Sequence, residues 1–134
     1  MADTLKNKVA LVTGASRGIG KSIVEAFARE GCNVIICGRK RETLDEVARA
    51  IGPTVKPIAC HVGRLDQIES MLATIDREFG RVDILVNNAA TNIAQGPCLE
   101  MDDAQFDKMI EINLKSTFRL VQRVAPGMCT RRSG

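Results

Sequence analysis

At 134 residues, the chain has the length of one domain with a single buried core. Hydrophobic residues make up 45% of it and charged residues 26%, which excludes the composition of a disordered chain. A net charge of only +3, with four Phe and neither Trp nor Tyr, argues against nucleic acid as a partner.

The first predicted element is a strand at Val9–Val12, which is apolar at every position, as in a parallel sheet covered on both faces. It leads into the glycine-rich turn Gly14-Ala-Ser-Arg-Gly18-Ile-Gly20 and a helix predicted from about Gly18 to Glu30. The glycines allow a tight turn and leave the first helical amides uncovered, where the helix dipole attracts an anion. The alternative is a turn that only connects two elements.

The rest of the chain alternates between short apolar runs and amphipathic stretches. Strands are predicted at residues 33–37, 56–62 and 82–86, and helices around residues 44–51, at 65–79 and from 102 or 103 to 124, before Pro126-Gly127. This alternation predicts βαβ units in a single domain over residues 1–134. The expected fold class is α/β, with a doubly wound parallel sheet covered by helices on both faces.

Five cysteines are scattered without Cys-x-x-Cys pairs, and this odd number favours reduced thiols over disulfides or a metal site. Most of them are expected to be small core residues. The N-terminus lacks a basic segment followed by a long apolar run, and no stretch approaches a membrane span. A cytoplasmic location with no membrane partner is therefore predicted.

Two motifs resemble those of the short-chain dehydrogenase/reductase family. Thr13-Gly-Ala-Ser-Arg-Gly-Ile-Gly20 resembles its cofactor motif, and Asn87-Asn-Ala-Ala90 resembles its second motif, usually Asn-Asn-Ala-Gly, after the fourth strand. The resemblance extends from Asn7 to about Met128 and implies a Rossmann-like sheet with strand order 3-2-1-4. It also implies hydride transfer between a nicotinamide dinucleotide and a small carbonyl or alcohol substrate, as in carbonyl and 3-oxoacyl reductases.

The ligand of an open α/β sheet binds beyond the carboxyl ends of the strands, where the strand order reverses. The first motif is then expected to face a pyrophosphate, and the resemblance places the second beside the nicotinamide-side ribose. Asn88 has an alternative role as a scaffold that ties the loops together. The residues predicted to bind the cofactor here are Gly14, Ser16, Arg17, Gly18, Ile19, Gly20, Asn88, Ala89 and Ala90.

The end of the second predicted strand bears on the choice of cofactor, because an acid there would bind the ribose 2′-OH of NAD. This chain has Cys37-Gly38-Arg39-Lys40 instead. Arg39, with help from Arg17 and Lys40, offers cations to a 2′-phosphate, so NADP is predicted and NAD is the less favoured cofactor. The alternative is a solvated basic turn.

Two further residues are assigned roles near the cofactor. His61, the only histidine, follows the third predicted strand with Val62, and a contact to the adenine edge or a loop hydrogen bond is favoured over catalysis. Asn113 lies on the last predicted helix and matches the Asn of the family's catalytic tetrad, where it helps to hold a water in the proton relay. The alternative for Asn113 is a hydrogen-bonding role inside the helix.

The family's remaining catalytic groups, a Ser and a Tyr-x-x-x-Lys segment, are not found in the chain, which contains no Tyr and stops where a fifth strand is expected. The chain is therefore interpreted as the cofactor-binding half of a reductase, without strands five to seven and inactive by itself. The alternative is a non-catalytic nucleotide-binding or interaction module that pairs with an intact reductase subunit. Self-association is expected through the last helix or the bare edge of the fourth strand.

Overall fold

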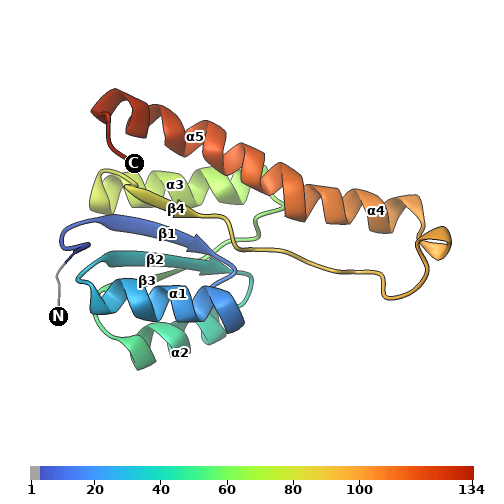
Figure 1. Ribbon diagram of the computed structural model, residues 1–134, viewed down its shortest axis with the longest axis horizontal. Helices are drawn as coiled ribbons and strands as arrows, with labels where there is room; N and C mark the ends of the chain where they lie inside the picture. The colour runs from blue at the N-terminus through green and yellow to red at the C-terminus, as the bar shows by residue number, and fades with distance from the viewer. Residues whose placement is uncertain (1–3) are drawn as a thin grey trace.

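The computed structural model describes residues 4–134 and contains one parallel sheet (Figure 1). Its four strands are β1 (Val9–Thr13), β2 (Asn33–Gly38), β3 (Val55–Ala59) and β4 (Ile84–Val86), in the order β3-β2-β1-β4. All three neighbouring pairs are parallel, with Leu11 beside both Ile35 and Leu85. The predicted fold class and strand order are thereby confirmed.

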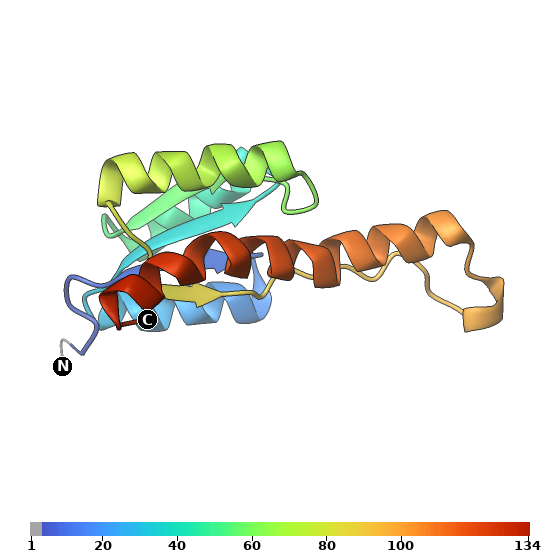
Figure 2. The ribbon, with the colours of Figure 1, turned by 90° about the horizontal axis from the view of Figure 1, so that it is seen from above.

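Helices cover both faces of this sheet. On one face lie α1 (Gly18–Arg29) and α2 (Arg41–Ile51), and on the other lie α3 (Leu65–Phe79) and α5 (Ser116–Arg131) (Figures 1 and 2). A short 3₁₀ turn (Cys98–Glu100), α4 (Asp103–Ile110) and a π-helical turn (Glu111–Lys115) connect β4 to α5. In Figure 2, α4 extends well beyond the sheet at the end where the strands finish.

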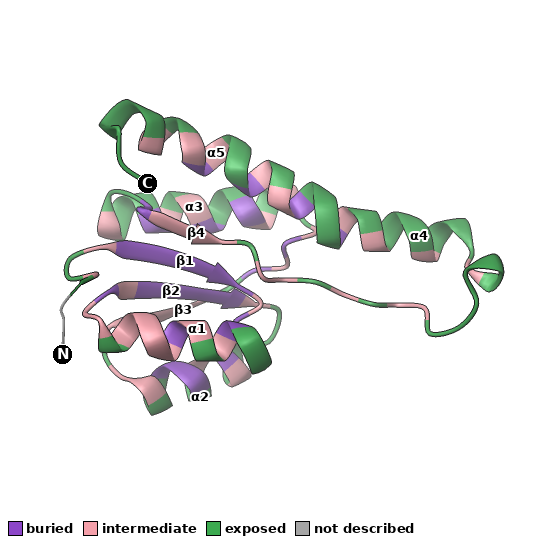
Figure 3. Cartoon of the chain, in the orientation of Figure 1, coloured by how far each residue is buried: buried purple, intermediate pink, exposed green. Residues whose placement is uncertain are grey.

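Two apolar layers hold these elements together, because successive strand residues point to opposite faces of a sheet. Leu11 and Ile35 belong to the layer under α3 and α5, whereas Val12 and Ile36 belong to the layer over α1 and α2. All five residues of β1 are buried, as Figure 3 shows for the centre of the sheet. The uninterrupted apolar character of this strand therefore follows from its central place between two helical layers.

Predicted boundaries were wrong in three elements, the last helix and the third and fourth strands. The fourth strand begins at Ile84 rather than at residue 82. The last helix does not end at Val124 but continues through Pro126 to Arg131. Pro126 has no amide to donate to the preceding turn, and it lies at an exposed position of the helix. The Arg131 guanidinium holds the following turn by donating to the carbonyl of Val82 over 2.9 Å. The third strand stops at Ala59 rather than Val62. The amide of Cys60 still donates to the carbonyl of Gly38 over 2.9 Å, and the chain turns at residues 62–63.

Three of the five cysteines are buried, Cys32, Cys37 and Cys60, while Cys98 and Cys129 are exposed, and all five are free thiols. The prediction that most are core residues is confirmed. A hydrogen bond with Cys60, together with burial, raises the pKa of the Cys37 thiol well above its ordinary value. Within the described chain, no helix combines the length and apolar character needed to cross a bilayer.

One buried acid fixes the start of the sheet. Asp83 is 4% exposed, and its carboxylate accepts hydrogen bonds from the amide of Val9 over 2.9 Å and from the Arg81 guanidinium over 3.1 Å. The amide of Asp83 in turn donates to the carbonyl of Val9 over 2.7 Å. The side chain therefore joins β4 to β1 before their ladder begins.

Replacing Asp83 by alanine is expected to reduce the free energy of unfolding by about 3 kcal/mol, because the Val9 amide and the Arg81 guanidinium lose a charged partner. Urea unfolding followed by circular dichroism measures the change. Asp66→Ala is the matched control, since the Asp66 ion pair with Arg64 is exposed and should contribute less than about 1 kcal/mol. Equal losses in the two variants would contradict the role given to Asp83.

Candidate functional site

A cleft of about 420 Å³ opens at the carboxyl ends of the four strands. It is lined by the turns that follow β1, β2, β3 and β4, and by residues of α4 and the π-helical turn. Eleven of the predicted site residues line it: Gly14, Ser16, Arg17, Gly18, Ile19, Arg39, His61, Val62, Asn88, Ala89 and Ala90. Three predicted site residues do not line the cleft, although each is next in sequence to a residue that does: Gly20, Lys40 and Asn113.

The turn after β1 presents unused backbone donors. No side chain caps the N-terminus of α1, its first turn carries no acid, and among residues 4–134 the amides of Gly18, Ile19 and Gly20 donate to no other group. These donors and the positive end of the helix dipole form an anion-binding surface. Gly18 has a φ of +58° with open space beside its Cα, so a ligand can approach the backbone there.

Close packing explains the other two glycines of the motif. A Cβ on Gly14, whose φ is +64°, would lie 2.8 Å from the Cα of Ala89. A Cβ on Gly20 would lie 2.4 Å from the carbonyl oxygen of Gly14 and 2.6 Å from Nδ2 of Asn88. The two motifs therefore touch through glycine positions that leave no room for a side chain.

Asn88 joins the two motifs directly. Its side-chain amide donates to the carbonyls of Thr13 and Gly14 over 3.1 and 3.0 Å. The hydroxyl of Thr13 accepts the backbone amides of Asn88 and Ala89 over 3.0 and 2.9 Å. Of the two alternatives for Asn88, these contacts show the scaffolding role, and among residues 4–134 its side-chain oxygen accepts no hydrogen bond.

Positive charge is concentrated at one end of the cleft. Arg39 follows β2 and Arg17 precedes α1, both are exposed, and within the described chain neither forms an ion pair or a side-chain hydrogen bond. Lys40 precedes α2 and is exposed outside the cleft lining. Arg41, the next cation, is engaged with Asp45 over 2.8 Å. Arg39 and Arg17 are therefore two cations free to meet an anionic ligand at this end of the cleft, which Lys108 also lines from α4.

Asn113 holds the loop that follows β4. Its side-chain oxygen accepts the amide of Thr91 over 2.7 Å, and its side-chain nitrogen donates to the carbonyl of Thr91 over 2.9 Å. Asn113 lies in the π-helical turn, a distortion that is frequent at functional sites. The hydroxyl of Ser116 donates to the carbonyl of Ile112 in the same turn. Asn113 therefore positions the cleft wall, and both ends of its amide are in use.

This combination of glycine turn, crossover and second motif is reflected in sequence comparison. A family model described as "short chain dehydrogenase" matches residues 8–134, which is nearly the whole chain. The chain belongs to the short-chain dehydrogenase/reductase family.

Individual relatives in the family agree with this assignment. The chain is 40% identical over 97% of its length to galactitol 2-dehydrogenase of Agrobacterium fabrum, covering 50% of that protein. It is 36% identical over 98% of its length to human dehydrogenase/reductase SDR family member 4, covering 49% of that protein. The chain thus spans about half the length of the curated relatives it matches.

Solved structures of the family show the same fold. A metagenomic short-chain oxidoreductase in complex with NADP superposes with a TM-score of 0.92 at 36% identity, over 98% of this chain and 61% of that one. The 3-ketoacyl-(acyl-carrier-protein) reductase from Brucella melitensis complexed with NADH superposes with a TM-score of 0.87 at 29% identity, over 91% of this chain and 50% of that one.

Several lining residues of this family member were missed by reasoning from the sequence: Cys37, Gly38, Cys60, Thr91, Ile93, Lys108 and Ile112. The first three lie at strand ends, so the rule that ligands bind at carboxyl ends could have found them. Lys108 and Ile112 belong to α4 and the π-helical turn, and only the path of that helix across the cleft brings them there.

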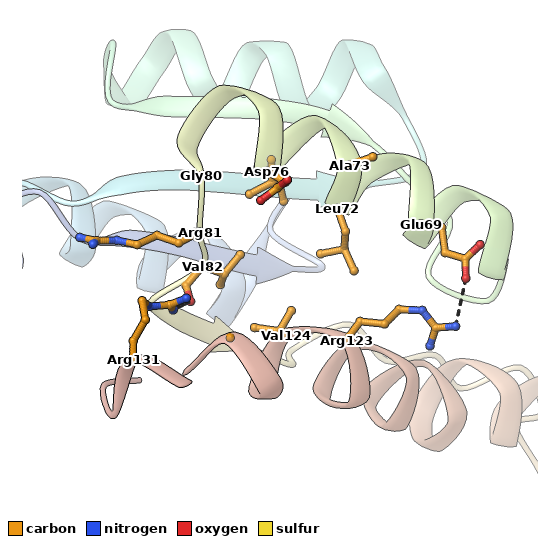
Figure 4. A pocket seen from close by; sticks show the side chains of 12 residues that line it. Glu69, Leu72, Ala73, Asp76, Gly80, Arg81, Val82, Arg123, Val124 and Arg131 are labelled. Carbon is orange, nitrogen blue, oxygen red and sulfur yellow. Dashed lines mark hydrogen bonds and ion pairs between the residues drawn. The ribbon is translucent and has the colours of Figure 1, made fainter. Parts of the chain in front are cut away.

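A second cavity, of about 390 Å³, lies between α3 and α5 near the start of β4 (Figure 4). Leu72, Val82 and Val124 are among its apolar lining residues. Two of its arginines already have partners, since Arg123 pairs with Glu69 over 3.0 Å and Arg131 donates to the Val82 carbonyl. It shares no lining residue with the carboxyl-end cleft, which remains the candidate site of this family member.

Proposed function

We propose that this chain is the NADP(H)-binding half of a short-chain dehydrogenase/reductase that transfers hydride between nicotinamide and a carbonyl or alcohol carbon. The observation that carries the proposal is that one cleft contains the amides of Gly18 and Ile19 and the guanidinium of Arg39, none of which has a hydrogen-bond partner among residues 4–134. Both solved relatives described above hold a nicotinamide dinucleotide, in one case NADP and in the other NADH. This supports the cofactor class, and the charge of the cleft supports the preference for NADP.

The residues present fit such a cofactor. The amides of Gly18, Ile19 and Gly20 would bind the pyrophosphate, because they point out of an uncapped helix N-terminus. Arg39 and Arg17 would bind the 2′-phosphate, with Lys40 adding positive charge nearby. Asn88, Ala89 and Ala90 would hold the ribose on the nicotinamide side. The bound cofactor would supply or accept the hydride, and this chain's residues would bind and orient it.

Titration with NADPH and NADH tests the cofactor preference. NADPH is expected to bind roughly ten- to a hundredfold more tightly than NADH, because a hydrogen bond to a charged group contributes about 1.5–3 kcal/mol. Arg39→Ala should remove most of this preference by weakening NADPH binding alone. Fluorescence of the reduced nicotinamide reports both affinities.

Arg41→Ala is the matched control for that titration, since Arg41 belongs to the same basic run but is paired with Asp45. This variant should keep the wild-type preference. Equal affinities of the wild type for the two cofactors, or the same loss in both variants, would contradict the assignment to Arg39.

Self-association is expected through the outer side of the last helical segment. Apolar side chains recur there at three- and four-residue spacing and are exposed: Phe106, Ile110, Leu114, Phe118 and Val121. We call these five residues the apolar helix face. A continuous apolar surface of this kind is typical of an association site. It is also the observation that favours the second candidate function, a module that pairs with an intact reductase subunit.

Light scattering over a dilution series is expected to show a concentration-dependent dimer or larger species for the wild-type chain. A double substitution, Leu114→Glu with Phe118→Glu, should shift the chain to monomer, because both side chains are 61% exposed and removable without loss of core packing. Leu99→Glu is the control, since Leu99 is 99% exposed but lies outside the apolar helix face.

The outcome distinguishes the two predicted contact sites. Association that persists in the double variant would exclude the apolar helix face and leave the edge of β4, which among residues 4–134 pairs only with β1. A wild-type chain that is monomeric at every concentration would contradict both.

A further inference from the structure

Arg119 is a partly buried cation at the junction of two walls of the cleft. It lies on α5 with its side chain 15% exposed, and it does not line the cleft itself. Its Nη1 donates to Oε1 of Glu111 over 2.6 Å and to the carbonyl of Gly63 at the longer distance of 3.5 Å. A guanidinium Nη carries two hydrogens, so one atom can serve both acceptors. Arg119 therefore links the π-helical turn to the loop that follows β3.

Both acceptors are next in sequence to residues that line the cleft. Glu111 precedes Ile112, and Gly63 follows Val62, and both Ile112 and Val62 line the cleft. A Cβ on Gly63 would lie 3.5 Å from Cγ1 of Ile112, so the two walls also approach each other through an apolar contact. The link made by Arg119 is thus placed where it can set the separation of these walls.

The helical segment that leads into this link has little other contact with the sheet. α4 contains no buried residue, and in Figure 2 it extends beyond the ends of the strands. From residue 87 onward, Ile112 is the first buried residue. The hydrogen bonds between Asn113 and Thr91 tie the π-helical turn to the loop after β4, and Arg119 ties it to the loop after β3. The turn is therefore held to two strand ends by polar contacts.

Glu111 carries the negative charge that orients Arg119. Burial alone would raise the pKa of Glu111, but hydrogen bonds from Arg119 and Lys115 outweigh it and lower this pKa below its ordinary value. Nζ of Lys115 lies 3.3 Å from Oε2 of Glu111, so the two carboxylate oxygens have separate cationic partners. Glu111 therefore stays ionised at neutral pH and holds the Arg119 guanidinium beside the Gly63 carbonyl.

We propose that Arg119 is a positioning residue for the cofactor, which holds the π-helical turn and the loop after β3 at the separation that a bound dinucleotide needs. This step rests on the proposed function. Arg119 lies behind the cleft lining, so its effect reaches the ligand through the wall residues Ile112 and Val62. It should act on NADPH and NADH alike, whereas Arg39 should act on NADPH alone.

Titration of NADPH and NADH against variants at position 119 tests the proposal. Arg119→Met, which keeps a long unbranched side chain, should weaken both cofactors by about tenfold, because walls that are not preorganised must be ordered on binding. The ratio of the two affinities should stay as in the wild type. Arg119→Lys should weaken both by only about threefold, since an ammonium keeps the charge but not the fork of a guanidinium.

A double-mutant cycle shows whether Glu111 and Arg119 act together. Glu111→Ala should weaken NADPH about as much as Arg119→Met, and the double variant should bind no more weakly than either single variant, as expected for two residues of one link. Independent contributions would instead multiply to a loss of about a hundredfold.

Arg123→Met is the matched control. Arg123 lies one turn further along α5 and pairs with Glu69 over 3.0 Å, outside the cleft lining. This variant should lose about as much stability in urea as Arg119→Met but keep the wild-type affinity for both cofactors. Urea unfolding of each variant verifies that it is folded in the titration, and Arg119→Lys and Glu111→Ala decide the question if Arg119→Met does not fold.

Wild-type affinity in a folded Arg119→Met variant would overturn the inference, as would an equal loss of affinity in Arg123→Met or losses that multiply in the double variant. A loss confined to NADPH would also overturn it, because Arg119 would then contact the 2′-phosphate directly. In those cases the proposed function stands. Failure of the wild-type chain to bind either cofactor would instead overturn the proposed function, and this inference with it.

Discussion

No reduction of carbonyl substrates is expected from the purified 134-residue chain, even at saturating NADPH. The sequence contains no Tyr to protonate a developing alkoxide. The buried hydroxyl of Ser116 donates to the Ile112 carbonyl, and Asn113 uses both ends of its amide on Thr91. General acid catalysis contributes about a hundred- to ten-thousandfold to rate, so turnover should lie at least that far below that of an intact reductase.

An assay against a panel of ketones and 3-oxoacyl thioesters measures this, with NADPH binding verified in the same preparation. Gly20→Ala, which should lose the cofactor site, identifies contaminating reductases, because their turnover would be unchanged by the substitution. Turnover that is present in the wild type and absent in Gly20→Ala would show that the chain contains a proton donor of its own.

Gly20→Ala is expected to cause the largest loss of stability of any single methyl addition in the glycine turn. The new Cβ would lie 2.4 Å from the carbonyl oxygen of Gly14 and 2.6 Å from Nδ2 of Asn88, and the first of these is a backbone atom with little freedom to move. Overpacking of this kind typically costs about 1–3 kcal/mol and occasionally more, and this contact belongs at the upper end. We expect a loss of about 3 kcal/mol.

Thermal unfolding should report this loss as a melting temperature lower by about 10 °C or more. Cofactor affinity should fall as well, because the clash moves the amides that bind phosphate. Gly127→Ala is the matched control within α5, where the new Cβ would lie 3.0 Å from one guanidinium nitrogen of Arg131, a side-chain atom that can shift while the other nitrogen keeps its bond to Val82. Gly127→Ala should be neutral or stabilising by up to about 1 kcal/mol, since alanine is the better helix former. A smaller loss for Gly20→Ala than for Gly18→Ala would contradict this account.

The fold was largely predictable because each strand and helix carries a strong local pattern. The apolar run at Val9–Val12 and the glycines that follow α1, α2 and α3 are signals that tertiary packing reinforces. The extension of α5 beyond Pro126 was not predictable in this way. Proline normally indicates a helix end, and here a contact far away in the sequence, between Arg131 and Val82, stabilises the turns that follow it.

The candidate site was likewise predictable only in part. Its glycines and Arg39 could be identified because their roles depend on backbone conformation and on place after a strand. The π-helical turn around Asn113 does not change the apolar periodicity of the sequence, so the hydrogen bonds between Asn113 and Thr91 could not be predicted. The hydrogen bond that Nδ1 of His61 accepts likewise comes from the backbone amide of Gly63, two residues away, and residue types alone do not reveal it.

The contact between Thr13 and Asn88 also has a consequence for how the chain folds. It joins residues 75 positions apart, so the cleft is complete only after β4 has docked beside β1 and the intervening crossovers have closed. Contacts of such long sequence separation form slowly, because the chain loses loop-closure entropy before the contacts contribute any stabilisation. A dinucleotide that recognises only the finished cleft would therefore act as a folding ligand: at a hundred times its dissociation constant it would stabilise the native chain by about 2.7 kcal/mol.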